Sequence, residues 1–291
     1  MFFIKIIKYL VQAILVYFFF IIIKIIGLSL SRKFFSFFFN AIGPLIKSKQ
    51  TINNNLEKFL GLYNEDIKKN TKFKMWTNYG KTFVEYLYLK KFKNESSHIE
   101  IKGEEILDKI KKENKPVIFV SGHFANFELM SMELTKRNIN LATIYRPLNN
   151  FFLNPFMEYL RKKYVCSKQI KKGLVGVKDS IHYIKNNFSI ALMIDQRVSE
   201  GKKLPFFEHM AFTTTMPAQM ALKFNLDIVP IYIARKTDDN FKIEIYAPIK
   251  ILKTDDAETN KLNVSIGLNK ILEEMISRDP EQWIWTHNRW K

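Results

Sequence analysis

His123 and Glu128 are the two residues whose types and spacing best fit a chemical task. A neutral imidazole can take a proton near pH 7, and a carboxylate can fix its tautomer and stabilise the imidazolium that forms. Together they can deprotonate a hydroxyl that attacks an acyl carbonyl, as in a serine-hydrolase triad with an external alcohol in place of the serine. Taken alone, the pair fits equally well an ordinary loop histidine and an exposed helix glutamate.

The position of His123 in the chain strengthens the catalytic interpretation. It follows Val-Ser-Gly directly behind a short apolar run at residues 116–120 that is typical of a strand buried on both faces. Gly122 permits a tight turn there. A spacing of five residues does not suit one continuous helix, in which neighbours on a face are three or four apart, but a strand-to-helix turn can bring Glu128 back to the ring.

The elements around this pair alternate. Further strand-like runs lie at 142–145, 190–194 and 228–233, and helical segments at 124–137, 152–163, 174–187 and 217–225. This order predicts an α/β fold with a mostly parallel central sheet flanked by helices, whose site lies beyond the carboxyl ends of the strands. We also expect helix over 51–93, an edge strand at 241–247, and a closing helix marked by Val264, Leu268, Ile271 and Met275.

The N-terminal segment is strongly apolar. Residues 9–23 carry one strongly polar side chain, Gln12, and after Lys24 the apolar run resumes and closes at Arg32 and Lys33. Its length is about the ~20 residues that cross a bilayer as a helix. We therefore predict a retained membrane anchor at 1–33 and a catalytic domain at 34–291. The excess of basic residues after the anchor favours a cytoplasmic catalytic domain.

The bulk composition limits the partners. With 46 basic and 28 acidic residues among 291, the formal net charge is +18, which attracts polyanions such as anionic lipids or an acidic carrier protein. Part of this charge is also what an AT-rich genome would produce. The single cysteine, Cys166, rules out an intramolecular disulfide. There is no glycine-rich phosphate loop and no His/Cys spacing of a metal site, so neither a cofactor nor a metal is expected.

Several blocks in order resemble the bacterial lipid A biosynthesis acyltransferases, a lauroyl and myristoyl transferase family within the HX4D/E acyltransferase superfamily. Residues 121–128, Ser-Gly-His-Phe-Ala-Asn-Phe-Glu, resemble its signature, and the other blocks are 144–150, 195–196, 205–207, 213–218, 229–231 and 280–291. Ala125 and Phe127 stand where the family usually has Gly and Trp, which we interpret as packing changes. Glu208 and Met216 also depart from Gly, which puts the shape of the substrate pockets in doubt.

The resemblance implies transfer of a fatty acyl chain from acyl carrier protein to a hydroxyl of a lipid A precursor, at the cytoplasmic face of the bacterial inner membrane. It implies His123 and Glu128 as catalytic residues. The residues it implies for substrate binding are Arg146, Asn149, Asp195 and Gln196. Arg146 would grip a phosphate or polarise the thioester, although a structural salt bridge fits it as well. His287 is expected to pack.

Two alternatives remain open from the sequence. The same chemistry fits a lysophospholipid, glycerol-phosphate or other glycolipid acyltransferase that uses acyl carrier protein or acyl-CoA. From another class, the charge fits a non-catalytic protein that binds anionic membranes or nucleic acid. Nucleic-acid binding is not expected, because no nucleic-acid-binding fold signature occurs.

Overall fold

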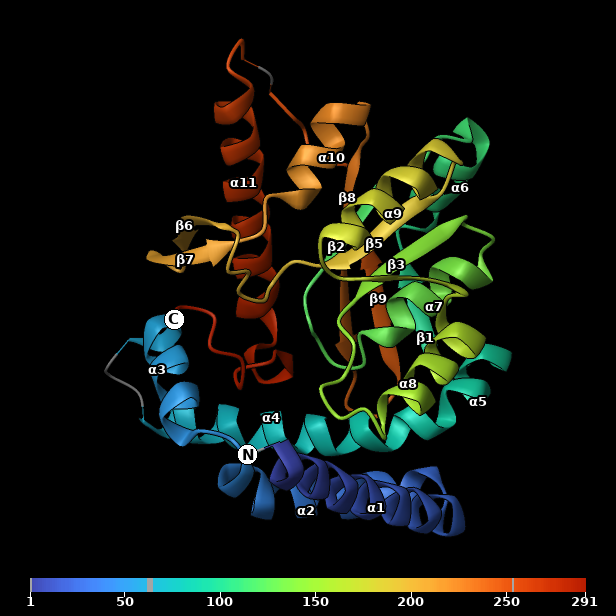
Figure 1. Ribbon diagram of the computed structural model, residues 1–291, viewed down its shortest axis with the longest axis vertical. Helices are drawn as coiled ribbons and strands as arrows, with labels where there is room; N and C mark the ends of the chain where they lie inside the picture. The colour runs from blue at the N-terminus through green and yellow to red at the C-terminus, as the bar shows by residue number, and fades with distance from the viewer. Residues whose placement is uncertain (1, 62–64, 253) are drawn as a thin grey trace.

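The computed structural model describes residues 2–61, 65–252 and 254–291. Within these residues the chain forms an α/β domain built on a seven-stranded sheet in the order β1-β9-β8-β2-β5-β3-β4 (Figure 1). The strands, in the order of the chain, are β1 (Ile99–Lys102), β2 (Ile118–Ser121), β3 (Leu141–Tyr145), β4 (Lys168–Lys171), β5 (Ser189–Met193), β8 (Ile228–Arg235) and β9 (Phe241–Ile245). The predicted α/β class with a mostly parallel sheet flanked by helices is confirmed.

The four predicted apolar runs became the central strands. β2, β5 and β8 are buried over nearly their whole length, which is why they read as continuous apolar sequence rather than as an alternation. β2 pairs in parallel with both β5 and β8, and β3 pairs in parallel with β5 and β4. These parallel pairs align the carboxyl ends of β2, β3, β4 and β5 at one edge of the sheet.

The prediction that residues 241–247 form an edge strand is wrong. β9 lies between β8, to which it is antiparallel, and β1, to which it is parallel. The edges are formed by β1 and β4, neither of which was predicted. Both are four residues long and β4 buries only Ile170, so neither carries a run of apolar residues that periodicity can detect.

Helices connect the strands across the sheet. α6 (Glu104–Glu113) joins β1 to β2, and α7 (Glu128–Lys136) joins β2 to β3. α9 (Leu174–Lys185) joins β4 to β5 and α10 (Met216–Phe224) leads into β8, in the opposite direction across the sheet. Because crossovers between parallel strands are right-handed, the β2–β3 connection places α7 on one face, and the β4–β5 and β5–β8 connections place α9 and α10 on the other.

Two further units flank this layer. α8 (Asn154–Leu160) continues as a π-helical turn, η2 (Arg161–Val165), before β4. A two-stranded antiparallel hairpin, β6 (Lys202–Phe206) and β7 (His209–Thr213), packs against the long closing helix α11 (Ala257–Arg278), which is followed by the short helix η3 (Pro280–Gln282). The predicted closing helix is confirmed, and its residues Val264, Leu268 and Met275 are buried.

The N-terminal helices form a layer beneath the sheet domain. α1 (Phe2–Ile26) and α2 (Leu28–Ile46) run along the long helix α4 (Glu65–Glu85), with α3 (Lys49–Leu60) at one end and η1 (Tyr86–Tyr88) and α5 (Leu89–Asn94) at the other (Figure 1). Phe20, Ile23, Phe35 and Val84 form a small apolar core between them. The predicted boundary between residues 33 and 34 falls inside α2, and the division into anchor and catalytic domain stays a prediction.

Candidate active site

The carboxyl ends of three parallel strands bring the candidate residues together. β2 and β5 are in register from Ile118 to Ser121, so His123 follows the end of β2 beside Asp195 and Gln196, which follow β5. Arg146 directly follows β3 on the other side of β5. His123, Glu128, Arg146, Asn149 and Gln196 all line one cavity of about 490 Å³. These five residues lie together where the sequence places them, and that this cavity is the active site stays a prediction.

His123 is held by Asp195. The Nδ1 of the ring lies 2.8 Å from Oδ1 of Asp195, and the backbone N–H of His123 donates to Oδ2 at 2.8 Å. The indole N–H of Trp283 donates to the same Oδ2 at 2.8 Å. Burial alone would raise the pKa of the Asp195 carboxyl, but His123 outweighs it and the pKa lies below its usual value. An ionised carboxylate therefore places the proton of the neutral imidazole on Nδ1 and leaves Nε2 as a base.

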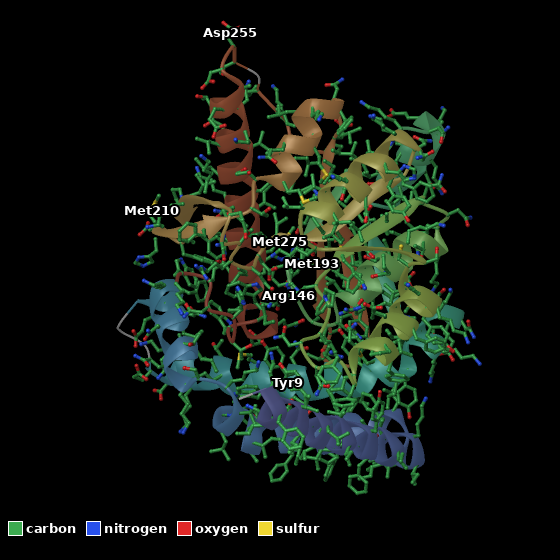
Figure 2. The ribbon with its side chains drawn as sticks, viewed as in Figure 1. Tyr9, Arg146, Met193, Met210, Asp255 and Met275 are labelled. Carbon is green, nitrogen blue, oxygen red and sulfur yellow. The ribbon has the colours of Figure 1, made fainter. Side chains whose placement is uncertain are left out.

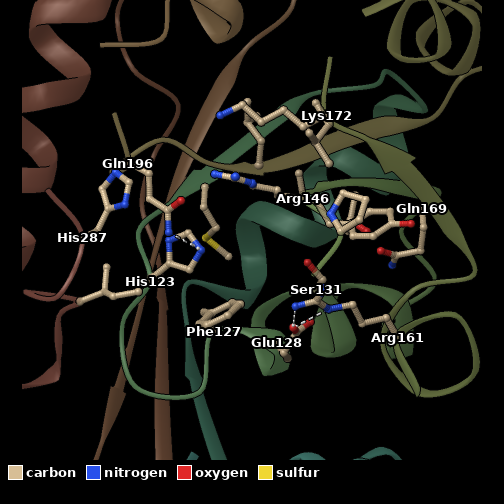
Figure 3. Close-up of a pocket in the computed structure, with 18 of the residues that line it drawn as sticks. His123, Phe127, Glu128, Ser131, Arg146, Arg161, Gln169, Lys172, Gln196 and His287 are labelled. Atoms are coloured by element: carbon tan, nitrogen blue, oxygen red, sulfur yellow. Dashed lines mark hydrogen bonds and ion pairs between the residues drawn. The ribbon is translucent and has the colours of Figure 1, made fainter. Parts of the chain in front are cut away.

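Glu128 does not contact the imidazole, so the expected His123–Glu128 pairing is wrong. Its carboxylate accepts from Arg161 at 2.6 and 2.7 Å and from the hydroxyl of Tyr86 at 2.9 Å. The ring of Phe127 lies between the two expected partners and packs edge to face on His123, with centroids 4.6 Å apart (Figure 3). Glu128 and His123 therefore face the same cavity with different partners.

The loop before α7 explains this arrangement. Ala125 has a φ of 44°, in the left-handed region that glycine adopts without cost. Its carbonyl accepts from Thr82, its N–H donates to the carbonyl of Gln282, and Asn126 donates to Glu85 at 3.0 Å. A glycine would adopt this φ at no cost, so the departure at Ala125 concerns backbone conformation as well as the packing that we expected.

Glu85 connects this loop to the rest of the domain. It is fully buried and paired with Arg235 from the end of β8 and with Arg32 of α2. Two guanidinium groups and the Asn126 amide therefore satisfy one buried carboxylate, as a charge removed from water requires. The network links α2, α4, β8 and the loop behind His123.

Basic and apolar side chains both line the cavity. Lys47, Arg146, Arg161 and Lys172 line it, and among its described lining residues Glu128 is the acidic one. Since Arg161 neutralises Glu128, the cavity carries a net positive charge. Arg146 and Met193, labelled together in the middle of Figure 2, belong to its wall. The apolar lining side chains are Phe127, Met130, Ile144, Pro147, Leu148, Val165, Ala191, Leu192, Met193, Val198, Met216 and Ile284.

The structure separates the residues predicted to bind substrate. Arg146 and Asn149 are exposed at the wall, and the amide of Gln196 lies 3.4 Å from Nε2 of His123. Arg146 forms no salt bridge among the described residues, so its structural alternative is not supported. Asp195 is fully buried behind the imidazole and does not line the cavity, so its assignment as a substrate-binding residue stays a prediction.

Sequence reasoning missed several residues of the cavity. Arg161 comes from the π-helical turn η2, a feature without a sequence signature that recurs at functional sites. Its burial opposes the charged form, but Glu128 and Tyr86 outweigh this and raise the pKa of Arg161. Lys172 follows the unpredicted strand β4. The pKa of Lys172 is lowered mainly by burial and also by the nearby positive charge of Arg146. His287 lines the cavity as well.

Comparison with known proteins identifies the family. A model of the bacterial lipid A biosynthesis acyltransferases matches residues 3–291, which is nearly the whole chain. The chain belongs to this family. No group of three or more His, Cys, Asp or Glu residues that could hold a metal ion occurs in the described ranges of this family member.

Curated relatives in the family are distant. The lipid A biosynthesis palmitoleoyltransferase of Escherichia coli (strain K12) is 25% identical over 207 residues, and its lauroyltransferase is 25% identical over 196 residues. A lipid A biosynthesis acyltransferase of Shigella flexneri gives the same 25% over 207 residues. In each comparison 66% of this chain is covered, and the chain spans about 61% of the length of the relative.

Proposed function

We propose that this protein transfers a fatty acyl chain from acyl carrier protein to a hydroxyl of a lipid A precursor, with His123 as the general base. The observation that carries the proposal is the buried Asp195 carboxylate bound to Nδ1 of His123, which leaves Nε2 directed at the cavity. Membership of the family and the names of the curated relatives support a lipid A precursor as the acceptor.

The reaction needs no covalent acyl-enzyme. Nε2 of His123 removes the proton of the acceptor hydroxyl as its oxygen bonds to the thioester carbonyl carbon. The tetrahedral intermediate then expels the thiolate, which takes the proton back from the imidazolium. Asp195 stabilises this imidazolium and keeps the tautomer that the reaction needs. Gln196, which lies beside Nε2, makes way for the hydroxyl or binds it.

The two kinds of lining side chain suit the two substrates. The apolar side chains can hold the acyl chain next to His123, while Arg146 and Asn149 bind polar groups of the substrates at the exposed wall. The guanidinium of Arg146 has no acidic partner among the described residues, so it can bind a phosphate of the acceptor or of the prosthetic arm of the carrier. Glu128 acts in this scheme as a positioning residue, because it holds the Arg161 guanidinium against the cavity.

We further propose that the protein binds the cytoplasmic face of the bacterial inner membrane through α1. This helix, apolar from Phe3 to Ile26 with a mean hydropathy of 2.4, is long enough to cross a bilayer. Its backbone and side chains, however, bind the domain along its length. Asn150 donates to the carbonyl of Tyr9, Tyr17 donates to the carbonyl of Phe152, and Lys24 donates to the carbonyl of Leu87.

These contacts favour a helix that lies in one leaflet. Tyr9 and Lys24 are separated by about 22 Å along a helix axis, so an upright α1 would carry the loop at residues 150–152 deep into hydrocarbon. The opposite face of α1 carries an exposed apolar stripe that projects from the domain in Figure 2. We define this stripe as Ile7, Val11, Ile14, Phe18, Ile21 and Ile25.

Exposed apolar residues next to the cavity lead towards α1, because Phe151 packs edge to face on Tyr9 of that helix. Lys47 and Leu148 line the cavity, and the exposed apolar residues Leu45, Ile46 and Phe151 flank them in the chain. A lipid acceptor could therefore move from the leaflet to His123 without crossing open water.

The decisive experiment incubates detergent-purified protein with acyl carrier protein carrying chains of different length and a tetraacylated lipid A precursor. Mass spectrometry of the lipid reports the chain length and the acceptor together. We expect a product one acyl chain heavier, and no product from a folded His123→Ala variant. Activity near that of the wild type in this variant would remove His123 from the mechanism, and failure of the wild type with every donor would refute the proposed reaction.

A further inference from the structure

The tautomer of His287 is set by the backbone. The ring lies in the segment after η3 and lines the cavity beside His123 and Gln196 (Figure 3). The backbone N–H of Arg197 donates to its Nε2 at 2.9 Å. Because a backbone N–H can only donate, Nε2 must be unprotonated, and the proton of the neutral ring lies on Nδ1.

The donor at Nδ1 is available. Burial lowers the pKa of His287 to about 4, so the ring is neutral near pH 7. A neutral ring does not repel the imidazolium that forms at His123 during the reaction. Among the residues that the structure describes, Nδ1 has no hydrogen-bond partner, and it is not one of the buried polar atoms left unpaired. It therefore has accessible surface on a residue that lines the cavity, and its proton is unused.

We infer that His287 is a further catalytic residue, whose Nδ1–H donates to the oxygen of the thioester carbonyl as it becomes an oxyanion. The inference rests on the proposed acyl transfer. As the alcohol oxygen bonds to the carbonyl carbon, its proton passes to Nε2 of His123 and the carbonyl π electrons move to oxygen. The resulting anion needs a donor on the side away from that base. When the carbonyl re-forms, the C–S bond breaks and the thiolate receives the proton from His123.

The arrangement suits this role because the two imidazoles are fixed in different tautomers, one presenting an acceptor to the cavity and the other a donor. Asp195 makes His123 an acceptor at the cavity, whereas the N–H of Arg197 makes His287 a donor there. A fixed neutral donor stabilises negative charge without reorganising during the reaction. Removal of one such donor typically lowers kcat by about 10²–10³-fold.

Two amide variants separate this role from a structural one. In His287→Gln, the side-chain oxygen can reach the place of Nε2 and keep the bond from Arg197, but nothing donates from the place of Nδ1. In His287→Asn, the shorter amide can put its NH2 at the place of Nδ1, while the bond from Arg197 is lost. We expect His287→Gln to lose about 10²–10³-fold in kcat with little change in KM, and His287→Asn to retain most activity.

The readout is the acyl-transfer assay with acyl carrier protein and the tetraacylated precursor, alongside thermal unfolding of each variant. A folded Gln variant with kcat near that of the wild type, a folded Asn variant as inactive as the Gln variant, or the reverse order of activities would overturn the inference. If the Gln variant fails to fold, kcat of the Asn variant is compared with that of the wild type. A kcat that stays near the wild-type value supports the inference, and a loss of about 10²-fold or more overturns it. An inactive wild type would instead refute the proposed reaction, so the two failures are distinguishable.

Discussion

Asp195→Asn should disable the general base while changing almost no volume. Oδ2 of Asp195 receives two fixed donors, the backbone N–H of His123 and the indole N–H of Trp283, each at 2.8 Å. An asparagine must turn its oxygen to these two donors, so its NH2 faces Nδ1 of His123. Nδ1 then has to accept, and the proton of the neutral ring moves to Nε2, the atom that should take the hydroxyl proton.

The expected loss is large because the base is present but protonated at the wrong nitrogen. A positioned general base typically contributes 10²–10⁴-fold, so we expect kcat to fall by about 10²–10⁴, or roughly 3–5 kcal/mol in activation free energy. KM should change little, since Asp195 does not line the cavity. The assay is single-turnover acyl transfer from acyl carrier protein, with lipid products measured by mass spectrometry.

A matched control makes the same chemical change elsewhere. Asp279 accepts from the hydroxyl of Tyr232 at 2.6 Å and does not line the cavity. An asparagine there can still accept from Tyr232 through its amide oxygen, so Asp279→Asn should keep kcat within a few-fold of the wild type. A folded Asp195→Asn protein with a kcat equal to that of the control would refute the tautomer argument.

Three further predictions follow from buried charge, the apolar stripe and titration. Glu128→Ala leaves the Arg161 guanidinium buried and unpaired, and should lower the free energy of unfolding by about 3–5 kcal/mol in denaturant titrations; a loss under 1 kcal/mol would contradict this. Phe18→Glu should weaken binding to anionic vesicles by roughly ten- to a hundredfold in sedimentation assays, whereas Leu174→Glu, an exposed control on α9, should not; equal binding of both would exclude the stripe. The folded pKa of His287 is about 4 and its ordinary value is 6.5, so the unfolded state binds more protons between these values. The free energy of unfolding should therefore decrease as the pH is lowered from 6.5 to 4, and it should decrease less in His287→Asn. Parallel curves of unfolding midpoint against pH for the two proteins would contradict this prediction.

The sequence contained most of the fold because the central strands bury both faces. β2, β5 and β8 are continuous apolar runs, so their existence and approximate bounds are legible without a structure. Their order is not legible in the same way. β2 pairs with β5 across a separation of 72 residues, and no local pattern states that these strands are neighbours.

This missing information explains why the expected His123–Glu128 pairing is wrong. The family signature is local, so a carboxylate five residues from His123 was the natural partner, whereas the true partner of the ring follows a strand much later in the chain. Asp195 was visible as a polar residue at the end of a strand, but its role depended on strand order. Arg161 left no signal at all, because a π-helical turn has no distinctive sequence period.

The contacts of His123 and Glu128 show that the five-residue spacing in the signature separates these two side chains and does not pair them. Between His123 and Glu128 the chain turns through Ala125 at positive φ before α7 begins, and Phe127 fills the space between the imidazole and the carboxylate. The spacing therefore places a base and an acid on one cavity wall while keeping them apart. Each is then free for a partner from elsewhere, Asp195 behind the imidazole and Arg161 in front of the carboxylate. A direct contact between His123 and Glu128 would leave the buried Asp195 carboxylate without its Nδ1–H donor and the Arg161 guanidinium without its opposite charge, which the low dielectric of the interior makes costly.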